Sequence, residues 1–156
     1  LGSMKDKEYT VQVIPQIAEV IRQSLSRLEP ALAGHAVVEA WDYTNSRRWI
    51  KRSDKLGEDP FGKLTVRAMM HPNPLSDYVG PSGPEDPGLT ILSIVRPDRS
   101  PLAVLSNFSM HYHGNGEGIH PDYFGIFTEQ LEAMVRQGHP DRPFTAMMSQ
   151  GTSGDL

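Results

Sequence analysis

The sequence predicts an α/β fold, with a mixed sheet in which a β-hairpin is followed by a βαβ crossover. Two apolar runs, 89–95 and 102–105, flank the turn-forming Pro-Asp-Arg-Ser segment 97–100, and together they predict the hairpin. Apolar residues recur at helical spacing after Pro121, and a short apolar run follows at 144–148. Because a strand, a helix and a strand then come in succession, we expect the two strands to be parallel.

The first half of the chain predicts one helix and one clear strand. Pro15 suits the first turn of a helix, apolar residues follow it at three- and four-residue spacing, and Pro30 ends the pattern. The valine-rich segment 35–41 predicts a strand. Residues 42–87 are rich in Gly, Pro, Asp and Asn, so they predict mostly connection, with one further short strand at 64–70.

Composition excludes several classes of protein. The chain has 156 residues, the size of one domain or of part of one. Its formal net charge is -4 and its basic residues form no dense run, so we expect no nucleic-acid partner. No stretch approaches the roughly 18 apolar residues of a membrane-spanning helix, so we expect no membrane span. The absence of cysteine excludes disulfides and thiolate zinc sites.

The two ends of the sequence differ from its middle. The first residues read as a cloning remnant followed by a polar run, so residues 1–12 are expected to be a tag and a disordered lead. Residues 13–156 are expected to form a partial α/β domain, because the sequence closes on a loop composition at 151–156. A fragment of a larger domain exposes apolar surface, and self-association is therefore a further expectation.

Polar segments follow both strands of the expected crossover. The first strand leads into residues 109–116 and the second into residues 149–155. In open α/β sheets, ligands bind outside the carboxyl ends of the strands. Because parallel strands end at the same edge, we expect imidazoles, hydroxyls, a carboxylate and glycines to gather there, as they do in hydrolytic sites.

Each of these residues also has an ordinary interpretation. His111 and His113 are two apart, so on a continuing strand both would face one side and could bind one metal, whereas strand-end histidines more often make ordinary hydrogen bonds. The Ser153-Gly154-Asp155 segment could serve a nucleophile or a phosphate, although such loops are common in turns.

Three further groups of residues receive a weaker interpretation. Arg47, Arg48 and Trp49 could bind an anion or an apolar ligand, but a solvated arginine pair beside a packed tryptophan is the more usual explanation. His120 suits a position near a helix start. The histidines to which the sequence assigns no role are His35, His71 and His139.

Several motifs occur in a fixed order along the second half. An Asn-Phe-x-x-His motif ends at His111, an Asp-x-x-Gly motif spans 122–125, and the run from 144 leads into the Gln-Gly-Thr-Ser-Gly-Asp segment that ends at Asp155. Upstream segments that share the resemblance are 28–31 and 46–49. Together these segments resemble the amino-terminal catalytic domain of the neutral/alkaline (non-lysosomal) ceramidase family, over nearly the whole chain after residue 13.

This resemblance implies a zinc-dependent amidohydrolase that cleaves an amide bond of a lipid or a related small-molecule substrate. It implies Zn²⁺ on His111 and further family ligands that lie outside this sequence, and His113, two residues on, could add a local second contact. Because a catalytic zinc generally needs three protein ligands, we expect weak metal affinity and no activity from this chain alone. The resemblance also suggests a secreted or periplasmic location.

The loop nucleophile is where the sequence departs from the family. The family's loop serine, its proposed nucleophile, falls on Gly151 here, so Thr152, Ser153 or a zinc-bound water would take its place, with Asp155 orienting the loop. Two other interpretations stay open. One is a non-catalytic binding module that retains the fold, and the other is a metal-free hydrolase in which Ser153 is the nucleophile and His111 or His113 the base.

Overall fold

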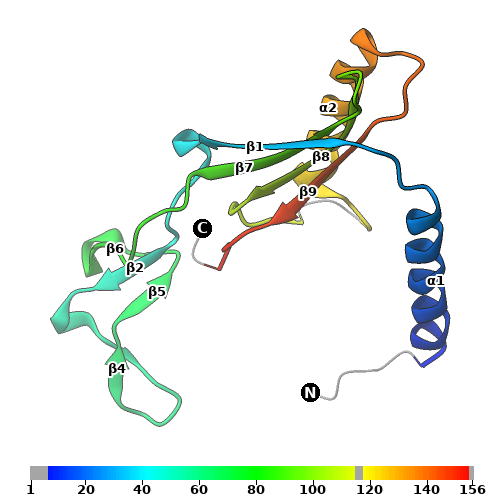
Figure 1. Ribbon diagram of the computed structural model, residues 1–156. Helices are drawn as coiled ribbons and strands as arrows, with labels where there is room; N and C mark the ends of the chain where they lie inside the picture. The colour runs from blue at the N-terminus through cyan, green and yellow to red at the C-terminus, as the bar shows by residue number, and fades with distance from the viewer. Residues whose placement is uncertain (1–6, 115–117, 155–156) are drawn as a thin grey trace. The chain divides into compact units, whose positions relative to one another are not determined.

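The computed structural model describes residues 7–114 and 118–154. The chain separates into two compact units, Leu1–Ala31 and Leu32–Leu156, and each is described by itself (Figure 1). Within the described residues, no helix combines the length and the apolar character that crossing a membrane requires.

The first unit consists of helix α1, Lys7–Ser26. The expected helix is confirmed, but its expected start at Pro15 is wrong, because Pro15 lies inside the helix. A proline in a helix interior removes one backbone hydrogen bond, and the flanking turns continue the helix on both sides. On the exposed surface, the carboxylate of Glu19 accepts hydrogen bonds from Arg22 and Gln23, which are pairs at the spacing that supports a helix.

The second unit is built on a four-stranded mixed sheet, in the order β1-β7-β8-β9. Strands β7 and β8 form the expected hairpin, β1 pairs antiparallel with β7, and β9 pairs parallel with β8. Helix α2 makes the crossover between β8 and β9. The bounds are β1 Leu32–Glu39, β7 Gly88–Val95, β8 Pro101–Phe108, α2 Asp122–Gly138 and β9 Thr145–Gln150. The expected fold class, hairpin and parallel crossover are confirmed.

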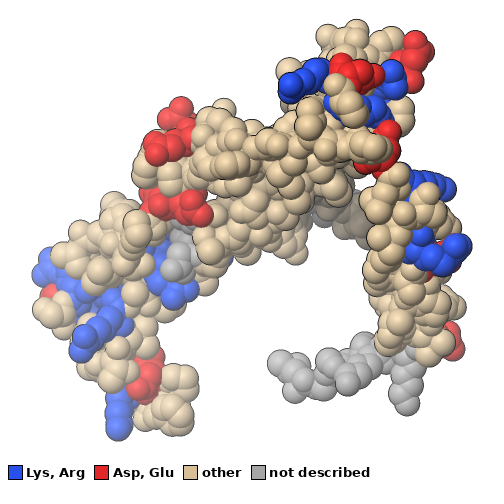
Figure 2. Space-filling model, viewed as in Figure 1, with Lys and Arg blue, Asp and Glu red and all other residues tan. Residues whose placement is uncertain are grey.

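The two faces of this sheet differ. Ser106 and Phe108 on β8 and Ala146 on β9 point to one face and are buried, and α2 packs there against β9. On the other face, Leu92, Leu105 and Met147 are cross-strand neighbours and are exposed. In the view of Figure 2, uncharged atoms cover most of the four-stranded sheet, while charged side chains gather over the small sheets and the helices.

The segment 42–87, expected to be mostly connection, holds two small antiparallel sheets, and this part of the expectation is wrong. One has the order β5-β2-β6 and the other pairs β3 with β4. Their strands have two to four residues, too few to show an alternating pattern, and glycine or proline stands at the end of two of them. The bounds are β2 Arg48–Lys51, β3 Gly57–Glu58, β4 Leu64–Val66, β5 Ala68–Met70 and β6 Tyr78–Pro81.

Candidate functional site

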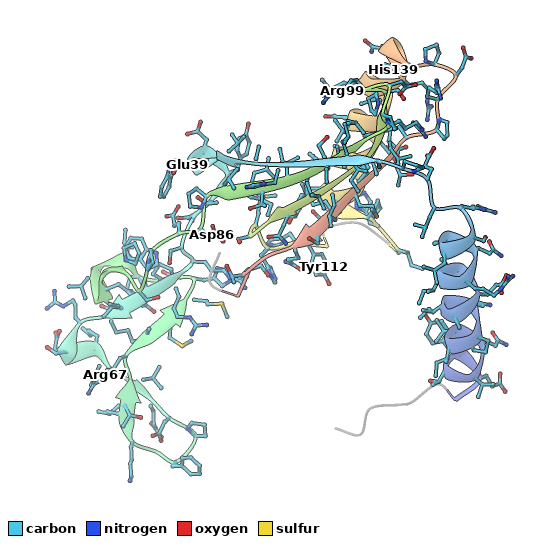
Figure 3. All side chains as sticks on the ribbon, in the orientation of Figure 1. Glu39, Arg67, Asp86, Arg99, Tyr112 and His139 are labelled. Carbon is cyan, nitrogen blue, oxygen red and sulfur yellow. The ribbon has the colours of Figure 1, made fainter. Side chains whose placement is uncertain are left out.

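The two polar loops that follow β8 and β9 lie at the same edge of the sheet, as the sequence predicts. The backbone N–H of Gly151 donates to the carbonyl of Phe108 at 2.8 Å, which extends the parallel pairing past the end of β9. The side-chain amide of Asn107 donates to the hydroxyl of Ser149 at 2.9 Å. In Figure 3, Asp86 and Tyr112 lie at this end of the sheet and Arg99, in the hairpin turn, lies at the other. We call this end the carboxyl edge.

Three loops of the carboxyl edge meet in a cluster of Asp86, Ser109 and Thr152, which we call the hydroxyl cluster. The Ser109 hydroxyl donates to Asp86 Oδ2 at 2.6 Å, and the Thr152 hydroxyl lies 3.3 Å from the same oxygen. The backbone N–H of Thr152 donates to Ser109 Oγ at 3.2 Å. The hydrogen bond from Ser109, followed by that from the Gly88 N–H, holds the pKa of Asp86 below its usual value. Asp86 is therefore an ionised acceptor that joins the segment before β7 to the ends of β8 and β9.

Gly151 has no room for a side chain. A Cβ atom at this position would lie 2.5 Å from Ser109 Oγ and 3.0 Å from Asn107 Oδ1. Real Cβ atoms do not come as close as 2.5 Å to another atom, so glycine fits where any other residue would force Ser109 to move. The expected nucleophile position at 151 is thus closed by a neighbouring hydroxyl.

A hollow of ≈ 210 Å³ opens beside this cluster, and we call it the histidine hollow. Its lining residues are Tyr43, Thr44, Asn45, Arg47, His71, Met110, His111 and His113. It therefore brings together the two histidines that the sequence predicts as metal ligands. His111 Nδ1 is buried and makes no hydrogen bond within the described part of the chain. Buried polar atoms are rarely left in this state.

Asp122 fixes the loop that carries His113. Its Oδ2 accepts the backbone N–H groups of His113 at 3.0 Å and Gly114 at 2.8 Å, and its Oδ1 accepts that of Tyr123. These bonds, with that from Gly114 the largest cause, hold the pKa of Asp122 below its usual value. Tyr123 donates its hydroxyl to the carbonyl of Met110 at 2.7 Å, and burial, with a smaller contribution from Asp122, raises its pKa. The start of α2 is thus tied to the segment 110–114.

The Asp-x-x-Gly motif has a structural explanation in this helix start. A Cβ at Gly125 would lie 2.5 Å from Pro121 Cγ, so only glycine lets the chain turn into α2 with Pro121 folded over the first turn. The N–H of Gly125 donates to the carbonyl of Pro121 at 3.2 Å. The motif therefore positions Asp122 against the loop beside the hollow.

Arg47 connects the histidine hollow to the loop after β9. It lines the hollow, and its guanidinium Nη2 donates to the carbonyl of Gly154 at 2.9 Å. Its Nε is buried and unpaired within the described residues. The loop 151–154 is therefore held at one end by Ser109 and at the other by Arg47.

His71 also lines the histidine hollow, and the sequence analysis assigned it no role. Its φ is 56°, in the left-handed region that is unfavourable for residues other than glycine. It also precedes Pro72, whose ring favours extended backbone at the preceding residue. Strained residues of this kind cluster at functional sites. A histidine directly before a proline inside a connection was the signal available in the sequence.

The remaining expected site residues have different outcomes. Thr152 lies in the hydroxyl cluster, Ser153 is half-buried in the same loop, and Asp155 lies outside the described residues. Among residues 7–114 and 118–154, no group of three or more His, Asp or Glu side chains could hold a metal ion. A larger hollow of ≈ 320 Å³ lies between α2 and the start of β9, away from the carboxyl edge. We place the site in the smaller hollow, because only that one contains imidazoles next to the expected ligand-binding edge.

The fold places this chain in the α/β class. It is a small domain, the size of a fragment, built from a mixed sheet and a crossover helix. A scan against models of known protein families finds no match, and a search of curated protein sequences also finds none. Among solved structures, the chain is similar to neutral ceramidase from Pseudomonas aeruginosa, with 18% sequence identity and a TM-score of 0.52. The match covers 89% of this chain and 19% of that enzyme's chain, so the likeness is distant and concerns the fold.

Proposed function

We propose that this chain carries part of the active site of a zinc-dependent amidohydrolase that cleaves an amide bond of a lipid or a related small molecule. The observation that carries the proposal is His111, which lines the histidine hollow and whose buried Nδ1 has no hydrogen-bond partner in the described part of the chain. A neutral imidazole nitrogen is among the commonest ligands of zinc, and coordination would satisfy this buried atom.

The residues present fit a partial zinc site. His111 would be the first ligand, and His113 would be a second contact from the same segment. The described residues supply no third group, whereas a catalytic zinc generally has three protein ligands. The remaining ligands would have to come from elsewhere, which agrees with a chain that spans 19% of the length of the ceramidase it resembles.

The chain's own residues would bind and orient the substrate around this position. Bound zinc would supply a Lewis acid that polarises the amide carbonyl. Arg47 would hold the loop 151–154 against the hollow, and the glycines of that loop would let backbone N–H groups approach the oxyanion. Thr152 and Ser153 are the candidate loop hydroxyls, since Gly151 offers none, and Asp155 would orient the loop.

The experiment is zinc binding by the chain, measured by metal analysis and titration calorimetry. We expect weak binding by the parent chain, a loss of at least about tenfold in affinity for His111→Ala, and no change for His139→Ala. His139 is the matched control because it follows the end of α2 and does not line the hollow. Binding that survives His111→Ala, or no binding by the parent chain, would overturn the proposal.

A second candidate function is a non-catalytic module that binds a small amide without hydrolysing it. The closed space at Gly151 favours it, because no side chain at that position could attack a substrate. Because the chain alone is expected to be inactive, hydrolysis of a fluorogenic N-acyl amide is measured on a protein that also supplies the missing zinc ligands, with and without a strong chelator, to distinguish the two. Chelator-sensitive turnover supports the enzyme, and zinc binding without turnover supports the module.

A further inference from the structure

Ser109 and Gly151 occupy neighbouring positions at the ends of parallel strands. Residue 109 follows β8 and residue 151 follows β9, and the N–H of Gly151 donates to the carbonyl of Phe108. A Cβ at residue 151 would lie 2.5 Å from Ser109 Oγ and 3.3 Å from Ser109 Cα. The serine hydroxyl is thus the closest atom, while Asn107 Oδ1, at 3.0 Å, and Ser109 Cα are tight contacts that need a shift of only a few tenths of an ångström.

The Ser109 hydroxyl is fully engaged where it lies. It donates to Asp86 Oδ2 at 2.6 Å and accepts the backbone N–H of Thr152 at 3.2 Å. Ser109 is 1% exposed, so these protein groups replace water as its partners. The other oxygen of Asp86 accepts the N–H of Gly88 at 3.2 Å, which fixes the carboxylate at the start of β7. A serine that is this deeply buried is placed to hold structure rather than to attack a ligand.

We infer that Ser109 is a positioning residue, which anchors the loop 151–154 through Asp86 and Thr152, and that positions 109 and 151 share one hydroxyl-sized space. A side chain fits at 109 or at 151, but not at both. Glycine at 151 is then the counterpart of serine at 109, and the hydroxyl that fills the shared space comes from the residue after β8 instead of from position 151.

The anchor acts on the histidine hollow through both of its neighbours. His111 lies two residues after Ser109, so a displacement of Ser109 moves the segment that carries His111. At the far end of the loop, the carbonyl of Gly154 accepts a hydrogen bond from the guanidinium of Arg47, and Arg47 lines the hollow. Only the link from this anchor to a zinc ligand rests on the proposed function. The shared space at positions 109 and 151 does not depend on zinc.

Three variants of the chain test the inference: Ser109→Ala, Gly151→Ser and the double variant Ser109→Ala/Gly151→Ser. We expect Gly151→Ser to lower Tm by several degrees, because its Cβ meets Ser109 Oγ. The double variant removes that oxygen, so it should recover at least half of the loss relative to Gly151→Ser alone. The matched control is Ser106→Ala/Gly151→Ser, because Ser106 is an equally buried serine of β8 that points to the opposite face. It should give no recovery.

A spectroscopic readout separates positioning from plain stability. We expect Ser109→Ala to shift the His111 ring resonances in ¹H–¹⁵N spectra, the double variant to return them toward the parent values, and Ser106→Ala to leave them in place. Additive Tm losses in the double variant, or unchanged His111 resonances in Ser109→Ala, would overturn the inference. A chain that shows the coupling and the resonance shifts but binds no zinc would support the inference while refuting the proposed function.

Discussion

Glu132 on α2 accepts a hydrogen bond from the backbone N–H of Ala146 on β9, at 3.1 Å. Strand β9 lies at the end of the described strand order, so this N–H points away from β8. Exposed strand edges are sites of unwanted pairing, and a helix side chain that takes up an edge donor protects it. The crossover helix therefore packs against the last strand and also accepts one N–H of its outer edge.

Replacing Glu132 tests this protection. Glu132→Ala leaves the buried N–H of Ala146 without its acceptor, so we expect the free energy of unfolding to fall by about 1–2 kcal/mol. Denaturant unfolding measures the change. Glu129→Ala, on an exposed position of the same helix, is the control and should stay within about 0.5 kcal/mol of the parent. Equal effects of both substitutions would show that the Ala146 contact contributes nothing.

Gly151→Ala should lower the free energy of unfolding by about 1–3 kcal/mol, as expected of an atom forced into occupied space. Gly154 lies in the same loop, and a Cβ there meets nothing within 4 Å. Gly154→Ala should therefore be close to neutral. Denaturant unfolding of the two variants side by side decides the point, and a neutral Gly151→Ala would mean that the loop relaxes freely.

The Asp86 carboxylate should make stability depend on pH. Its pKa in the folded chain is lowered, first by the Ser109 hydroxyl, so the ionised form stabilises the fold above the unfolded pKa of about 3.9. That contribution is lost as the pH falls through the folded-state pKa. Asp86→Asn should therefore lower Tm at pH 7 and match the parent chain in strong acid. Because Asp86 is exposed to solvent, the difference should stay within about 1 kcal/mol. If the difference in stability between the parent chain and Asp86→Asn does not depend on pH, the effect comes from packing of the side chain and not from its charge.

His71→Gly should raise the free energy of unfolding by about 1 kcal/mol, because glycine adopts a positive φ without strain. Arg99 is the matched control, since it also has a positive φ, of 68°, but lies in the hairpin turn away from the hollow. Arg99→Gly should give a similar gain. Thermal unfolding compares the two variants. A loss of stability in His71→Gly alone would show that packing of the imidazole stabilises the fold by more than the strained backbone destabilises it.

Asp122→Asn should loosen the segment beside the hollow. One carboxylate oxygen accepts the N–H groups of both His113 and Gly114, and charge-assisted hydrogen bonds are stronger than neutral ones. Amide hydrogen exchange at these two positions should become several-fold faster. Asp98→Asn, in the hairpin turn, should leave them unchanged, and equal exchange in Asp122→Asn would remove this role from Asp122.

The larger sheet could be predicted from the sequence, whereas the smaller sheets and the contacts of the site could not. The hairpin and the crossover show in apolar runs and in a proline-containing turn, which are local signals. Strands such as Gly57–Glu58 are too short to leave a pattern. The contact between Ser109 and Thr152 joins residues 43 positions apart, and its geometry depends on strand register, which no local pattern records. From the sequence, Gly151 indicates only that the expected nucleophile is missing. The structure shows that the space for a side chain at this position is occupied by Ser109 Oγ.

The parallel pairing of β8 with β9 also determines when the site can form during folding. The β7–β8 hairpin closes over a short turn. Strand β9 can pair with β8 only when the long crossover connection brings it back to the sheet, and closing this longer loop costs more conformational entropy. The hydroxyl cluster contains residues from both sides of that step, so it assembles last. Substitutions in the hairpin should then slow refolding, and substitutions at Thr152 should mainly speed unfolding.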